Sequence, residues 1–281
     1  MNYARVAVNV GLTGYGALLF SNAFIRDSHG QPPYDKLEDE LLKQDVLNTA
    51  KALGMTNLEK LHLFTYDGYY AMSHGTLGTP GGAFLLLPKF FSREHLYQGK
   101  NRFGLDETVY RALRPNDDIR KFSIAHELVH VQRGDSYIKD GIFLSTMAAA
   151  SNLGKRYFRA SSPAKLLLSF AWLTVSYNIG WFAEMTYLRW SEHNADKKAA
   201  LLGKDYTEGG KLLCDKLLMA QKAVHDEHKY GWVWLDSTGE HRVSLSNPLC
   251  GDRRRRIEKV EKMWQLKNKS LAEAPMTDKY T

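Results

Sequence analysis

His126 and His130 are the residues whose types and spacing most clearly predict chemistry, because they lie four apart with Glu127 beside the first. In an α-helix, side chains four residues apart share a face, so both imidazoles can reach one metal ion. Zinc accepts imidazole nitrogen, prefers four ligands and in catalytic sites keeps one position for water. Glu127 is near enough to act on that water. The run therefore predicts a hydrolytic zinc site, provided that the segment is helical and a third ligand exists.

The residues around this run predict the helix that it needs. Pro115 and Asn116 are typical of a helix start, and Asp117 and Asp118 place negative charge in the first turn. Gly134 follows as a stop signal. Two histidines on a helix face are more often ordinary surface or core residues than ligands, so these flanking signals favour the metal site. Apolar residues surround the histidines, as expected for a buried helix: Phe122, Ile124, Ala125, Leu128 and Val129.

A third ligand is expected from a second helical segment, residues 189–202, which Gly203 would end. Glu192 and Asp196 lie four apart in it, so both carboxylates face one way. One carboxylate can complete a two-histidine zinc site, and the other can hold a ligand histidine through its second ring nitrogen. His193 is an alternative ligand, although it points about a quarter-turn away from Glu192. Such a carboxylate pair alone is weak evidence, since most lie on solvated helix faces.

Together the two segments resemble the M48 family of zinc metallopeptidases, and the resemblance covers roughly residues 50–260. It rests on the run from Ala125 to Asp135, a hydrophobic interval, and the run from Ser191 to Asp196. The resemblance implies three zinc ligands, a catalytic base and a carboxylate that supports the ligands. These are, in that order, His126, His130 and Glu192; Glu127; and Asp196.

The C-terminal part departs from the pattern of this family. Its members carry His-Pro followed shortly by Arg-Ile, with the histidine and the arginine close to the active site. Here Asn247 stands where the histidine would be, and the gap to Arg256 and Ile257 is longer. Asn247, Arg253 and Arg256 are therefore the candidates for stabilising the charge that develops on the carbonyl oxygen of a substrate.

These residues predict a zinc-dependent metalloendopeptidase that hydrolyses peptide bonds in protein substrates and binds one Zn²⁺ per chain. Zinc would activate a water molecule and polarise the scissile carbonyl, while Glu127, as general base, takes the proton and returns it to the leaving amine. The alternative is a non-catalytic scaffold or adaptor of the same fold that zinc stabilises. Asn247 favours the scaffold, whereas Glu127 favours the enzyme, because a structural site has no use for a base.

The segment before the metal helix predicts a sheet that binds substrate. Residues 61–66 are rich in apolar and β-favouring types, and Asp67-Gly68 predicts a hairpin to residues 69–72. By the family resemblance, the next strand lies at the edge above the zinc, where an extended peptide would pair with its main chain. The alternative is an ordinary buried strand. The residues of this predicted edge strand are Ala83, Phe84, Leu85, Leu86 and Leu87.

Composition sets outer limits on the class of protein. A chain of 281 residues can form one elaborated domain, and its two cysteines provide neither a disulfide framework nor a cysteine metal motif. The net charge of +7 is moderate, and no nucleic-acid motif accompanies the run of arginines from Arg253, so no nucleic acid is expected as a partner. The fold class expected is α+β: a mostly helical zincin domain of the gluzincin type, with a small antiparallel sheet and an inserted helical hairpin.

Two hydrophobic segments raise the question of a membrane. Residues 166–183 carry no charge and approach the length needed to span a bilayer, and residues 7–25 are a weaker candidate. A buried core helix or a signal segment are the respective alternatives. The expected organisation is an N-terminal hydrophobic segment (1–30), a metallopeptidase domain (31–266) with the hairpin at 137–188, and a polar tail (267–281). Membrane association is the expected localisation, and the cytoplasm the alternative.

Overall fold

The computed structural model describes residues 34–66, 70–92, 116–157, 163–227, 238, 240 and 248–273. These residues form a mostly helical α+β structure with a small mixed sheet of four strands. They divide into two compact units: residues between 36 and 134 and from 189 onward form one, and residues 135–188 belong to the other. Asn247 and the hydrophobic segment 7–25 lie outside the described residues.

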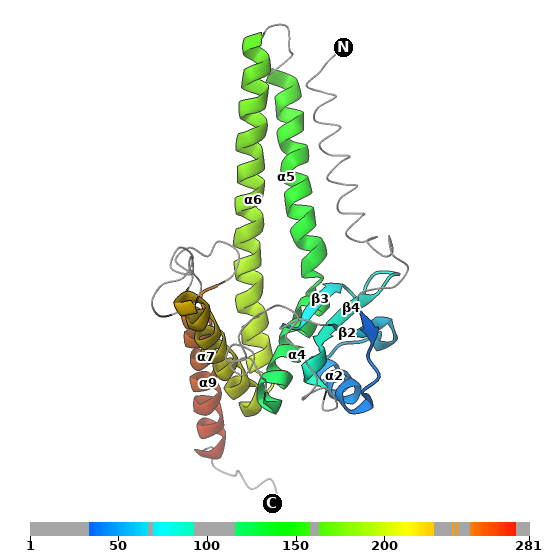
Figure 1. The fold of residues 1–281 in the computed structure, drawn as a ribbon, viewed down its shortest axis with the longest axis vertical. Helices are drawn as coiled ribbons and strands as arrows, with labels where there is room; N and C mark the ends of the chain where they lie inside the picture. The colour runs from blue at the N-terminus through cyan, green and yellow to red at the C-terminus, as the bar shows by residue number, and fades with distance from the viewer. Residues whose placement is uncertain are drawn as a thin grey trace, which may run out of the picture. The chain divides into compact units, whose positions relative to one another are not determined.

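The sheet has the strand order β1-β2-β4-β3. Its strands are β1 (Asp35–Lys36), β2 (Leu61–Tyr66), β3 (Met72–Gly75) and β4 (Ala83–Pro88). β4 runs parallel to β2, with Leu61 opposite Ala83, and antiparallel to β3, with Ser73 opposite Leu85. The sheet is therefore mixed, and the antiparallel sheet that the sequence predicted is wrong for the pairing of β2 with β4. The hairpin predicted between residues 61–66 and 69–72 is also wrong, because β4 separates β2 from β3 (Figure 1).

β4 is an interior strand, so the prediction that Ala83–Leu87 form the edge strand is wrong. Leu85, Leu86 and Leu87 are all buried, although alternate side chains point to opposite faces of the sheet. A strand that is apolar on both faces belongs in the middle of a sheet, whereas edge strands are commonly short and polar. β3, with the sequence Met72-Ser73-His74-Gly75, is such an edge strand.

The helix that carries the two histidines is α4 (Asp117–Arg133). The Asn116 side chain accepts a hydrogen bond of 2.8 Å from the Ile119 amide, and α4 ends at Gly134 in the left-handed region, as predicted. One face of α4 packs on the sheet and on α2 (Glu40–Ala52) through Ile124, Leu128 and Val131. The chain enters β1 before this helix, and the Asp39 side chain caps the N-terminus of α2.

The opposite face of α4 packs against α7 (Lys204–Glu227) and α9 (Cys250–Glu273). Phe122 and Ala125 of α4 join a second apolar cluster with Ile257 and with both cysteines, which are buried as free thiols. α9 begins at Cys250 and includes the arginine run. It also continues to Glu273, so the first seven residues of the predicted polar tail belong to this helix.

The second unit is a helical hairpin of α5 (Asp135–Tyr157) and the first part of α6 (Pro163–Ala200). The Trp172 indole donates 2.9 Å to the Ala150 carbonyl, and the rings of Phe143 and Tyr177 meet edge to face. α6 is continuous, so the helical segment predicted at 189–202 and the hydrophobic segment 166–183 belong to one helix. Among the residues that the structure describes, no helix combines the length and the apolar character that crossing a membrane requires.

The short 3₁₀ helices η1 (Leu58–Lys60) and η2 (Lys89–Phe91) flank β2 and β4. η1 leads directly into β2, and η2 follows β4. Both hold the ends of the two parallel strands close to α2 and α4, since Leu58 and Phe91 join the cluster that fills the space beneath the sheet.

Candidate metal centre

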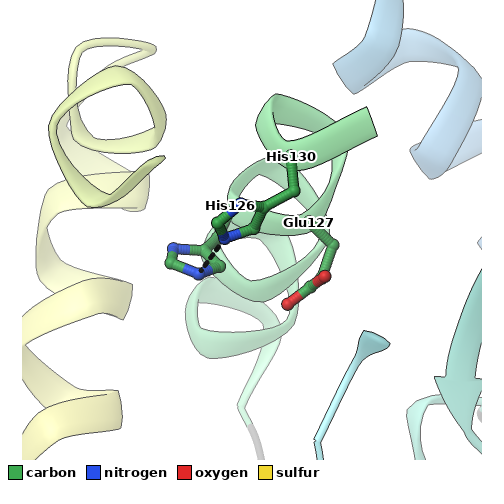
Figure 2. Close-up of side chains that lie close together, drawn as sticks. All are labelled: His126, Glu127 and His130. Atoms are coloured by element: carbon green, nitrogen blue, oxygen red, sulfur yellow. Dashed lines mark hydrogen bonds between the residues drawn. The ribbon is translucent and has the colours of Figure 1, made fainter. Parts of the chain in front are cut away.

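α4 presents His126 and His130 on one face, as the spacing predicts (Figure 2). The two Nε2 atoms lie 3.1 Å apart and the rings meet edge to face at 73°. Glu127 projects from the same helix beside them, and each of the three residues offers a ligand atom within 4.8 Å of the others. His126 is buried because Phe122, one turn earlier, packs against its ring.

Glu192 of α6 brings the third set of ligand atoms to the two rings. Its Oε2 lies 3.3 Å from His126 Nε2, and its Oε1 lies 3.4 Å from His130 Nε2. A tetrahedral metal with bonds of about 2.0–2.1 Å would hold neighbouring ligand atoms about 3.3–3.4 Å apart. Two imidazoles and one carboxylate are also the donor set of hydrolytic zinc sites. These residues therefore fit zinc in both chemistry and spacing.

Polar side chains behind the two rings fix their orientation. His126 Nδ1 lies 3.0 Å from Asp196 Oδ1, and His130 Nδ1 lies 3.2 Å from the Ser191 hydroxyl. Asp196 is fully buried one turn after Glu192 on α6. Contacts of this kind set which ring nitrogen faces a metal, so Asp196 takes the supporting position that the sequence predicts for it.

Arg253 of α9 completes the charge arrangement. Its Nε donates 2.8 Å to Asp196 Oδ2 and its Nη2 donates 2.6 Å to Oδ1, a two-point contact, while Nη1 lies 3.8 Å from Glu192 Oε2. Arg253 therefore holds the carboxylate behind His126. Arg256, three residues on, is exposed, and Arg255 is exposed and paired with Asp252.

The charges of the site shift the pKa values of its members. Burial opposes protonation of His126, but Glu192 and Asp196 outweigh burial and raise the pKa of this imidazole. Burial likewise opposes the charge of Glu192, yet His126, His130 and Arg253 lower the pKa of that carboxyl far below its usual range. Arg253 and His126 hold the pKa of Asp196 at about 2 in spite of its burial. Both carboxylates are thus ionised at neutral pH, which suits a divalent cation.

Ser73 of the edge strand β3 contacts the remaining acidic residue. Its hydroxyl donates a hydrogen bond of 2.7 Å to Glu127 Oε2. Glu127 and Glu192 therefore differ in their partners: a serine hydroxyl holds Glu127, and the two imidazoles hold Glu192.

The structure brings together six of the residues that the sequence singled out. They meet beside α4 and are His126, Glu127, His130, Glu192, Asp196 and Arg253. His193 does not join them; burial and the charge of Arg256 lower the pKa of its imidazole. Ser73 and Ser191 were missed. A serine in a short polar strand next to a metal helix carries little signal by itself, whereas Ser191, directly before Glu192, lay inside the motif.

Comparisons with family models, with curated proteins and with solved structures found no match to this chain.

Proposed function

We propose that this protein is a zinc metalloendopeptidase with a zincin-type domain resembling the M48 family. One observation carries the proposal: His126, His130 and Glu192 place nitrogen and oxygen atoms 3.1–3.4 Å apart, and a further carboxylate, Glu127, stands beside them without joining their contacts. A purely structural site does not need that additional carboxylate.

The residues of the chain divide the work of hydrolysis. Zinc, when bound, supplies a Lewis acid that polarises the peptide carbonyl and makes water acidic enough to lose a proton near neutral pH. Glu127 accepts that proton and returns it to the leaving amine. Asp196 orients His126, and Arg253 keeps Asp196 ionised and in place. The surrounding apolar clusters keep these helices in a fixed arrangement.

The edge strand β3 is the element that we propose for substrate binding, in place of β4. β4 pairs on both sides, whereas β3 stands last in the strand order of the described residues, which is the position at which an extended peptide adds to a sheet. Ser73 of β3 contacts Glu127, so a peptide on this strand would lie next to the base. Recognition through the main chain is compatible with many substrate sequences.

We also propose that the hairpin of α5 and α6 associates with a membrane. Large apolar side chains on this part of α6 are exposed, among them Leu167, Phe170, Ile179 and Phe182. Exposed apolar groups on one segment favour a lipid or protein surface over water.

The first experiment combines metal content with activity. Zinc content is measured by elemental analysis in purified wild type, Glu192→Gln, Glu127→Gln and Glu184→Gln. Cleavage of unfolded casein by the same four proteins is measured with and without a chelator. Glu184 lies on the same helix as Glu192 but outside the site, so Glu184→Gln is the matched control.

We expect about one zinc per chain in wild type, in Glu127→Gln and in the control, and loss of zinc in Glu192→Gln. Cleavage should be lost on chelation and fall by a factor on the order of 10²–10⁴ in Glu127→Gln. Wild type without zinc would contradict the metal site. Wild type with zinc but without cleavage would favour the non-catalytic scaffold over the enzyme.

A further inference from the structure

Glu127 has two possible roles at a metal centre, and its distances allow both. Its carboxylate belongs to the group of ligand atoms within 4.8 Å that includes His126 and His130, so a rotation of the side chain could bring it into direct coordination. A base must stay outside the ligand set, because a carboxylate bound to the metal cannot also accept a proton from water in front of it. Something must therefore hold Glu127 in one of the two positions.

Ser73 is the residue that contacts this carboxylate from outside the metal helix. Its hydroxyl donates 2.7 Å to Glu127 Oε2, which ties one oxygen to β3 and away from the histidine rings. A short hydrogen bond to a carboxylate is among the stronger hydrogen bonds in proteins.

The backbone that carries Ser73 is fixed by the sheet. Ser73 pairs with Leu85 of the interior strand β4, and Leu85 is fully buried in the core beneath the sheet. Gly75, at the end of β3, has φ of 86°, and a Cβ atom there would meet the backbone of Gly82 at 2.6 Å, so the backbone at this end of β3 lies close against the start of β4. A hydroxyl on so constrained a strand can define the position of the side chain it binds.

We infer that Ser73 is a positioning residue that keeps Glu127 as the base and prevents its carboxylate from becoming a fourth protein ligand. The role of Glu127 as a base rests on the proposed function. The position of Glu127 relative to the metal can nevertheless be measured without any turnover.

The test compares Ser73→Ala, Ser73→Thr and Ser92→Ala with wild type. Ser92→Ala is the matched control, because the Ser92 hydroxyl also donates 2.7 Å to a carboxylate, that of Asp39, but at the start of α2. One sample of each protein is loaded with cobalt(II), whose visible spectrum reports the number of ligands. A second sample is loaded with zinc, and its kcat and KM are measured on a peptide.

In Ser73→Ala the released Glu127 should join the metal, so the cobalt spectrum should change toward higher coordination. The kcat should fall about tenfold or more, with KM within about twofold, since misplacing a catalytic group costs chemistry and not binding. Ser73→Thr, which keeps a hydroxyl, should restore both readouts, and Ser92→Ala should match wild type.

An unchanged cobalt spectrum or an unchanged kcat in Ser73→Ala overturns the inference, as does failure of Ser73→Thr to differ from Ser73→Ala. If wild type binds cobalt but cleaves nothing, the proposed function fails. The spectrum of Ser73→Ala then still decides whether Ser73 holds Glu127 away from the metal.

Discussion

Arg253 supports the candidate metal centre through its contact with a carboxylate and not through the ligands themselves. Burial disfavours its charge, but Asp196 raises the pKa of its guanidinium well above the ordinary value. In turn the guanidinium allows Asp196 to stay ionised behind His126 while buried. Two opposite charges in the interior are stable only as long as both are present.

Arg253→Ala should therefore leave the buried Asp196 without its guanidinium partner and lower the free energy of unfolding by about 3–5 kcal/mol. Zinc affinity should fall as well, since outer contacts commonly contribute about 10- to 100-fold. The matched control is Arg255→Ala: the Arg255 side chain is 73% exposed against 13% for Arg253, and a surface change should cost about 0.5 kcal/mol or less. Denaturant unfolding and a zinc competition assay measure both effects.

The same pair gives a pH dependence whose sign follows from the pKa of Asp196. Its folded value of about 2 lies below the ordinary 3.8, so the stability that ionisation contributes is present above about pH 4 and is lost as pH falls toward 2. The stability difference between wild type and Arg253→Ala should be largest near neutral pH and shrink in acid. A difference that is constant with pH would contradict this assignment.

At the level of single residues, the sequence predicts well which acidic residues and histidines come together at the candidate site, and poorly which side chains contact them. His126 and His130 follow from helical periodicity, which places side chains four apart on one face, whereas Glu192 was implied by the resemblance to the M48 family. Which of the four arginines from Arg253 to Arg256 turns inward depends on how α9 packs on α6 and α7. The contact between Ser73 and Glu127 depends on the order of the strands in the sheet, so residue spacing in the sequence could not predict it.

Helix α7 shows how one glycine sets the distance between two elements. A Cβ atom on Gly209 would lie 2.0 Å from the carbonyl oxygen of Asp118, in the first turn of α4. The backbones of α4 and α7 therefore approach each other more closely than any side chain would allow. This contact holds the N-terminal end of the helix that carries both histidines.

Gly209→Ala should force α7 away from α4 and destabilise the protein by about 1–3 kcal/mol. Gly141→Ala is the matched control, because Gly141 also lies inside a helix and a Cβ atom there would meet nothing within 4 Å. The control should be neutral or stabilising by up to about 1 kcal/mol, since alanine favours helix more than glycine. Thermal unfolding of the two variants measures the contrast, and equal melting temperatures would contradict the argument.

Elements with local signals were predicted well, and pairings over a distance were not. Asn116 and Gly134 mark both ends of α4 because capping depends only on neighbouring residues. The Asp67-Gly68 signal suggested a hairpin that the sheet does not contain, because β4 takes the position beside β2. The buried leucines of β4 were the available evidence, since a strand apolar on both faces favours the interior of a sheet.

The hairpin of α5 and α6 exposes large apolar side chains, and changing them tests the proposed membrane association. After expression, the wild-type protein should remain in the membrane fraction on carbonate extraction. A variant that carries both Leu167→Asp and Phe182→Asp should move to the soluble fraction. Leu167 is 71% exposed and Phe182 64%; Leu41→Asp on α2, at 63%, is the matched control and should change nothing. Wild type found wholly in the soluble fraction would contradict the proposal.

The contact between Arg253 and Asp196 also affects when the protein can act during its own synthesis. Chains grow from the N-terminus, so His126 and His130 leave the ribosome first, Glu192 and Asp196 follow, and Arg253 comes last. Until Arg253 emerges, Asp196 lacks the cation that holds it behind His126. If the protein is the proposed protease, its site is complete only after Arg253 has left the ribosome, and we expect a half-made chain not to cleave the unfolded segments of its neighbours on the same polysome.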